Sequence, residues 1–171
     1  RFQGGVDPVW SPDGAILTHP GDDDKGMTLY HGDAAIAAAL RGKPEEAPKV
    51  SDPRLQGVYQ SIGKSGDTYS VITDQGGASI AQYQIIEGVI TPMGQSGRLC
   101  NNITSFPSDL PMLSRDSKYL SVYDSTTRST KIYNVNGTSC DLAVDLGFPT
   151  GKVSFNMDSS QITFHMDQFG E

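Results

Sequence analysis

The stretch VWSPDGAIL, residues Val9 to Leu17, places a turn signal between two apolar runs. Ser-Pro-Asp-Gly favours a chain reversal, because serine and aspartate side chains bond to nearby backbone groups and glycine accepts a positive φ angle. An alternating stretch at 15–18 follows, and a second one, at 27–30, comes after a loop. The predicted unit is an apolar strand, a polar turn, an alternating strand, a hairpin and another alternating strand.

The same order recurs three more times along the chain. The copies begin at Trp10, Ile62, Leu113 and Phe155, which are 52, 51 and 42 residues apart. This spacing is close to the roughly 40–50 residues that one four-stranded propeller blade occupies. The second copy is the weakest, since residues 62–66 have lost the Ser-x-Asp pattern.

These repeats predict an all-β protein, a β-propeller of four-stranded antiparallel blades. Further strands at 88–91 and 140–145 would be the outer strands of two blades. A single blade cannot bury both of its faces, so blades stack around a common axis. We expect blades at 1–50, 51–97 and 98–147, and an incomplete one at 148–171. About three and a half blades are too few to close a ring of 4–8, so further blades or partner chains are expected to complete it.

WSPDG, followed by an apolar strand and then by an "LYHGD" or "IYNVN" strand, resembles the WD-like repeat of bacterial TolB-type propellers. The resemblance covers most of the chain, although only residues 10–14 fit the anchor in full and the last copy has Met157 where the first has Pro12. TolB-type propellers are periplasmic scaffolds that bind other envelope proteins. The resemblance therefore implies an exported protein with a protein partner and no enzymatic activity.

The charge balance bears on the class of partner. The chain has 13 Lys+Arg against 20 Asp+Glu, a formal net charge of -7. It lacks the basic surface that attracts nucleic acid or anionic lipid, so nucleic acid is not an expected partner. No stretch approaches the roughly 18 consecutive apolar residues of a membrane span. The chain opens on Arg1, and we expect a processed chain or a fragment.

Two cysteines, Cys100 and Cys140, bear on the compartment. In an exported protein they would most simply form one disulfide that closes a loop of about 40 residues, worth about 3–4 kcal/mol. The alternative is two separate buried thiols. The expected location is periplasmic or extracellular.

One segment departs from the β pattern. Residues 33–40 form an alanine-rich run, with Asp33 placed as an N-cap and Gly42 as a C-terminal stop. The run predicts two turns of helix, although a strand is the rival. Because so short a helix is marginal alone, Ile36 and Leu40 are expected to pack on the propeller.

Metal and cofactor sites have weak candidates. Asp22, Asp23 and Asp24 gather three carboxylates that could hold calcium, but their spacing is not that of a helix-loop-helix calcium site, and solvation is the simpler interpretation. The histidines, His19, His31 and His165, lie in different repeats without the spacing of zinc ligands. We therefore expect no cofactor.

Catalytic patterns are incomplete as well. Gly63-Lys64-Ser65 looks like the end of a phosphate-binding loop, but the first glycine of such a loop is missing and a β-branched stretch follows instead of a helix. No Gly-x-Ser-x-Gly nucleophile pattern occurs in the sequence. Trp10 and most of the tyrosines lie in predicted strands, where packing between blades is the expected role and sugar stacking the alternative.

Two functional hypotheses follow. The favoured one is an exported non-enzymatic propeller that acts as a protein-interaction scaffold in the cell envelope. The alternative is the propeller domain of a larger enzyme, either a peptidase gate or a polysaccharide-active or glycan-binding module, with its catalytic residues outside this chain.

Overall fold

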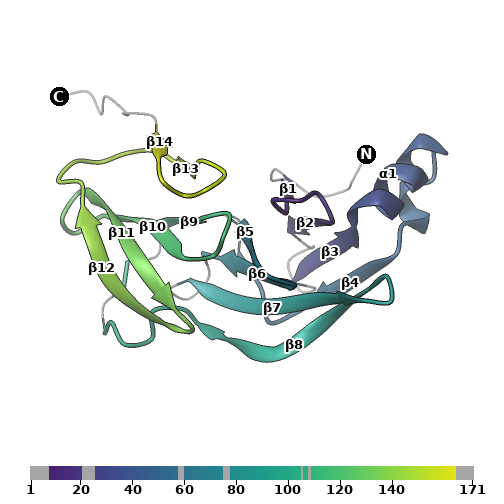
Figure 1. Ribbon diagram of the computed structural model, residues 1–171, viewed down its shortest axis with the longest axis horizontal. Helices are drawn as coiled ribbons and strands as arrows, with labels where there is room; N and C mark the ends of the chain where they lie inside the picture. The colour runs from purple at the N-terminus through teal and green to yellow at the C-terminus, as the bar shows by residue number, and fades with distance from the viewer. Residues whose placement is uncertain are drawn as a thin grey trace.

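The computed structural model describes residues 8–20, 26–57, 60–74, 78–104, 106–107 and 109–164. Within them lie three four-stranded antiparallel sheets and one two-stranded sheet (Figure 1). The first contains β1 (Val9–Trp10), β2 (Ile16–Pro20), β3 (Met27–His31) and β4 (Lys49–Asp52). The second contains β5 (Gln60–Ser65), β6 (Thr68–Thr73), β7 (Ser79–Ile86) and β8 (Val89–Arg98). The third contains β9 (Asp109–Leu113), β10 (Tyr119–Asp124), β11 (Ser129–Asn136) and β12 (Ser139–Asp145), and the fourth β13 (Val153–Phe155) and β14 (Ile162–Phe164).

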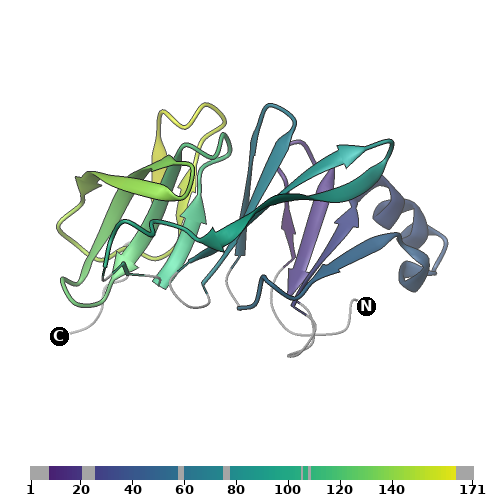
Figure 2. The same ribbon diagram turned by 90° about the horizontal axis from the view of Figure 1, so that it is seen from below.

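Each four-stranded sheet follows chain order from its first strand to its last. The first strands of the second and third sheets, β5 and β9, lie next to one another. The Ser61 hydroxyl of β5 accepts a hydrogen bond from the Leu113 amide of β9 at 2.9 Å, and the Lys64 amide donates to the Arg115 carbonyl at 2.6 Å. Figure 2 shows the sheets side by side along the molecule. This arrangement confirms the all-β prediction and the four-stranded antiparallel blades.

The turn that opens each repeat has a defined structure. In the first sheet the Ser11 hydroxyl donates to Asp13 at 2.7 Å and accepts from the Ile16 amide at 2.9 Å. Ser114 makes the equivalent bonds in the third sheet, to Asp116 at 2.7 Å and from the Tyr119 amide at 2.9 Å. Serine thus satisfies the backbone where the chain reverses.

The last repeat keeps this turn with different side chains. Asn156 accepts from the Gln161 amide at 3.0 Å through its side-chain oxygen. The fourth turn position is left-handed in every copy that keeps the turn, with φ 74° at Gly14, 63° at Ser117 and 58° at Ser159. The repeat predicted from the sequence is therefore a repeat of local geometry.

Two apolar clusters fill the junctions between sheets. One joins the first and second sheets and includes Ile16, Leu29 and Tyr83. The other joins the second and third sheets and includes Ile72, Leu120 and Tyr133. Tyr69 is buried in the first cluster, so packing between blades is confirmed for these three tyrosines.

Contrary to the prediction, Trp10 does not lie between two of the described sheets, and it is 42% exposed. It pairs with Leu17, whose side chain alternates with that of Ile16 and so points away from the second sheet. The indole lies instead against Gly32, where a Cβ would be 3.0 Å from its ring.

The helix prediction is confirmed, although its details differ. The helix α1 (Gly32–Leu40) is followed by a 3-10 turn, η1 (Pro44–Glu46). The N-cap is His31 and not Asp33, which lies in the first turn. The cause is a close approach at Gly32, whose amide donates to Ala15 at 2.8 Å and whose Cβ, if present, would lie 2.0 Å from the Gly14 carbonyl.

Ile36 and Leu40 do not pack on the propeller as predicted. They are 48% and 84% exposed. The helix packs through Ala35 and Ala38, which cluster with Ala47 and with Tyr30 of β3. Small side chains let the helix lie close to its neighbours, and the larger ones then point outward. Gly42, with φ 74°, ends the helix as predicted.

Candidate functional site

The carboxylate of Asp13, in the first turn, links the first two sheets. Asp13 accepts hydrogen bonds from the Tyr69 hydroxyl at 2.8 Å and from the Lys64 ammonium at 2.9 Å, and both partners belong to the second sheet. Burial alone would raise the pKa of Asp13, but the bonds from Lys64, Ser11 and Tyr69 outweigh it and hold that pKa well below its ordinary value. Asp13 is therefore a charged link between two sheets.

A similar link joins the third and fourth sheets. Asp116, equivalent to Asp13 in the repeat, accepts from the Ser159 hydroxyl of the last turn at 2.9 Å. Burial acts to raise its pKa, but bonds from Ser114, the Lys118 amide and Ser159 lower it overall. The carboxylate is ionised and accepts hydrogen bonds at neutral pH.

The junction between the second and third sheets is different. The residue equivalent to Asp13 and Asp116 is here Ser65, and a cleft of about 350 Å³ lies beside it. Polar, charged and apolar side chains all line this cleft. The second sheet contributes Ser65, Thr68, Ser70, Ile80 and Gln82, and the third contributes Leu113, Asp116, Ser117, Lys118, Val135 and Gly137. The candidate functional site is this junction cleft.

Ser117 contributes an unusual group to the junction cleft. Its hydroxyl oxygen is buried and has no hydrogen-bond partner among the described residues. The residue also holds a left-handed φ of 63°. It faces Gly63, where a Cβ would lie 2.5 Å from the Ser117 hydroxyl and 2.5 Å from the Ser114 carbonyl. Glycine at 63 is therefore required by the close approach of two sheets.

The structure around Gly63 also shows that Gly63-Lys64-Ser65 is not part of a phosphate-binding loop. Gly63-Lys64-Ser65 is the end of β5, and the chain turns into β6 two residues later. No helix begins there to present amide groups to a phosphate. The segment is a blade hairpin, as predicted from the β-branched stretch that follows it.

A buried carboxylate ties the outer part of the first sheet to the second. Asp52, at the end of β4, accepts from the Tyr83 hydroxyl at 2.6 Å and from the Arg54 guanidinium at 2.8 Å. Burial raises its pKa, and the bonds from Arg54 and Tyr83 lower it to about 2 overall. Burial beside this carboxylate raises the pKa of Tyr83 far above its usual range, so its hydroxyl remains a donor.

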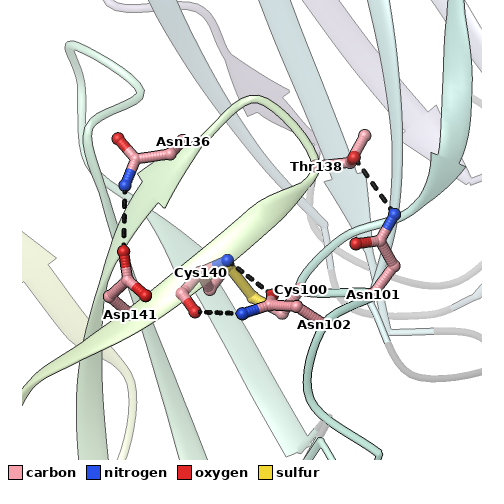
Figure 3. The surroundings of a disulfide bond; sticks show 7 residues. All are labelled: Cys100, Asn101, Asn102, Asn136, Thr138, Cys140 and Asp141. Carbon is pink, nitrogen blue, oxygen red and sulfur yellow. Dashed lines mark hydrogen bonds between the residues drawn. A yellow bond between two sulfur atoms is a disulfide. The ribbon is translucent and has the colours of Figure 1, made fainter.

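Cys100 and Cys140 form a disulfide, with their Cα atoms 4.7 Å apart (Figure 3). The bridge attaches the connection before the third sheet to its outermost strand, β12. Asn102 reinforces it, because its side chain both donates to the Cys140 carbonyl and accepts from the Cys140 amide, each at 2.8 Å. The alternative of two separate thiols is thus excluded.

The other predicted site residues have separate outcomes. Asp22, Asp23 and Asp24, the calcium candidates, and His165 lie outside the described residues. Among the residues that are described, no three His, Cys, Asp or Glu side chains come together in a way that could hold a metal ion. The described part of the chain also contains no helix long and apolar enough to cross a bilayer.

The comparisons with known proteins agree with the geometry. No family model and no curated protein matches the sequence. Among solved structures, TolB from Acinetobacter baumannii matches 97% of this chain, with a TM-score of 0.52 and 15% sequence identity. The fold is that of part of a TolB propeller. The chain spans 39% of the TolB chain, about two fifths of its length.

Sequence reasoning missed the junction cleft. The signal was present, because the second copy of the repeat has Ser65 where the others have Asp13, Asp116 and Asp158. The copy that lacks the carboxylate is the one whose turn lines the junction cleft. In a TolB-like fold each blade contacts its neighbours, so a residue lost from one turn changes the junction with the next blade.

Proposed function

We propose that this chain is part of an exported β-propeller that acts as a non-enzymatic scaffold for protein partners in the cell envelope. The TolB-like fold supports the scaffold role by its resemblance to envelope propellers. The Cys100–Cys140 disulfide supports export, because such bonds persist in oxidising compartments and are rare in the cytosol.

The observation that carries the interaction role is the outer side of α1. Ile36 and Leu40, one helical turn apart, expose large apolar side chains while Ala35 and Ala38 hold the helix in place. Exposed apolar surface on an anchored element is typical of a protein contact. Figure 1 shows α1 at one end of the molecule, beside the first sheet.

The proposal includes the organisation of the chain. Blades with limits near residues 50, 97 and 147 fit the grouping of strands into sheets. Further blades, from outside the 171 residues, would complete the ring, since closed propellers have 4–8 blades.

Site-specific photo-crosslinking in the producing cells tests the interaction. A benzoylphenylalanine at Leu40 should give a discrete adduct with one envelope protein, and Leu40→Lys should weaken binding of that purified protein by about tenfold or more. The matched control position is Arg128, which is exposed in the turn between β10 and β11. Identical adducts at both positions, or cysteines that are fully reduced in the cells, would contradict the proposal.

A further inference from the structure

The three junctions of the propeller differ in what fills them. Asp13 bonds to Tyr69 and Lys64 at the first, and Asp116 bonds to Ser159 at the third. At the second, the equivalent Ser65 leaves the junction cleft open, and the Ser117 hydroxyl is buried there without a partner among the described residues.

We propose that the junction cleft binds one sugar ring, either as a free monosaccharide or as the end of a glycan. Sugar hydroxyls both donate and accept hydrogen bonds. The cleft offers the same mixture, from the hydroxyls of Ser65 and Thr68, the amide of Gln82 and the ionised carboxylate of Asp116.

The polar groups of the second sheet are free to change partners. Gln82 donates to the Ser70 hydroxyl at 3.4 Å, and Gln84 donates to the Thr68 hydroxyl at 3.5 Å. Both distances are long for hydrogen bonds, so the contacts are weak. A ligand hydroxyl at a normal distance would replace them at little cost.

The charge and the apolar lining residues favour a neutral ring over an anion. Asp116 and Lys118 line the cleft as an ion pair at 3.2 Å, so its formal charge is zero. Ile80, Leu113 and Val135 provide apolar surface for the C–H groups of a ring. A volume of about 350 Å³ falls at the lower end of small-ligand sites, about 300–1,000 Å³.

The test is a titration of the ¹⁵N-labelled 171-residue chain, followed by amide chemical shifts. The probes are D-glucose, D-galactose and N-acetyl-D-glucosamine at millimolar concentrations. At least one of them should shift the amide signals of Ser65, Gln82 and Ser117 together in a saturable manner. If none of the three sugars shifts these signals, the proposal is wrong.

Two variants locate the binding. Ser65→Asp supplies a carboxylate equivalent to Asp116, which accepts from Ser159 at the third junction. The new side chain should occupy the cleft and weaken sugar binding by about tenfold or more. Gln82→Leu removes the amide at similar volume and should also weaken it about tenfold. The control is Ser154→Asp, the same substitution at an exposed position of β13.

The outcomes distinguish binding in the junction cleft from binding elsewhere on the chain. Unchanged circular dichroism with lost binding in both cleft variants, and normal binding in the control, supports the proposal. Sugar binding that survives Ser65→Asp and Gln82→Leu overturns it. Methyl glycosides distinguish the two sources, since a glycan end tolerates the methyl group and a site for the free sugar rejects it, and either result is consistent with the site.

Discussion

At the scale of the residue, single carboxylates connect neighbouring sheets. Asp52 is 3% exposed and accepts bonds from Arg54 and Tyr83, and Asp13 is bonded by Lys64 and Tyr69. The hydrogen bonds exceed the effect of burial at both positions, so the pKa of each carboxyl is lower in the folded chain than in the unfolded one. Their stabilisation depends on pH as a result.

The sign of that dependence follows from the direction of the shifts. A carboxyl whose folded pKa is depressed stabilises the fold above its unfolded pKa, 3.8, and the stabilisation is lost as pH falls through the folded value, about 2 for Asp52. The free energy of unfolding should therefore decrease as pH falls from about 5 to about 2.

Asp52→Asn should lower the free energy of unfolding at pH 7, because it removes the charge that Arg54 and Tyr83 stabilise. The expected loss is about 1–2 kcal/mol, since solvent screens the partly exposed Arg54. It should also flatten the decrease below pH 5. Urea unfolding at a series of pH values measures both effects. The control is Asp67→Asn, in the exposed hairpin turn between β5 and β6. An equal loss in the two variants would show that Asp52 has no special role.

At the scale of the element, the turn that opens each repeat determines where β2, β10 and β14 begin. Ser114 is fully buried. Its hydroxyl donates a hydrogen bond to the Asp116 carboxylate and accepts one from the Tyr119 backbone amide. Ser11 makes the same pair of bonds in the first sheet. One residue type at one position thus fixes the path of the chain in two blades.

Ser114→Ala should lower the free energy of unfolding by about 1–3 kcal/mol, because it leaves the Tyr119 amide without its acceptor. Thermal or urea unfolding measures this change. Ser125→Ala, in the exposed turn after β10, should stay within about 0.5 kcal/mol of the parent chain. If the two variants were equally stable, the turn would not have the role that we assign to it.

The elements show what sequence reasoning can reach. The strands and turns were predictable because turn chemistry and alternation are local, and the Cys100–Cys140 pairing was the simpler of two interpretations. The N-cap at His31 and the exposure of Ile36 and Leu40 were not predictable, because they depend on how closely Gly32 and the alanines approach the first sheet. The junction cleft depends on contacts between sheets and was missed for the same reason.

At the scale of the whole molecule, the sheets stabilise one another. Each of the first two junctions holds an apolar cluster, one around Tyr83 and one around Leu120, and each junction also has polar contacts near the opening turns. Neither face of the second sheet would be buried without its neighbours, which is the general property of propeller blades. The fold as a whole depends on these junctions.

The most direct test is a nuclear Overhauser spectrum of the labelled chain in solution. We predict cross-peaks between the Tyr69 ring and the Asp13 side chain across the first junction, and between the Lys64 amide and Arg115 across the second. Cross-peaks confined to strands of the same sheet, with none across either junction, would contradict the packing of blades side by side.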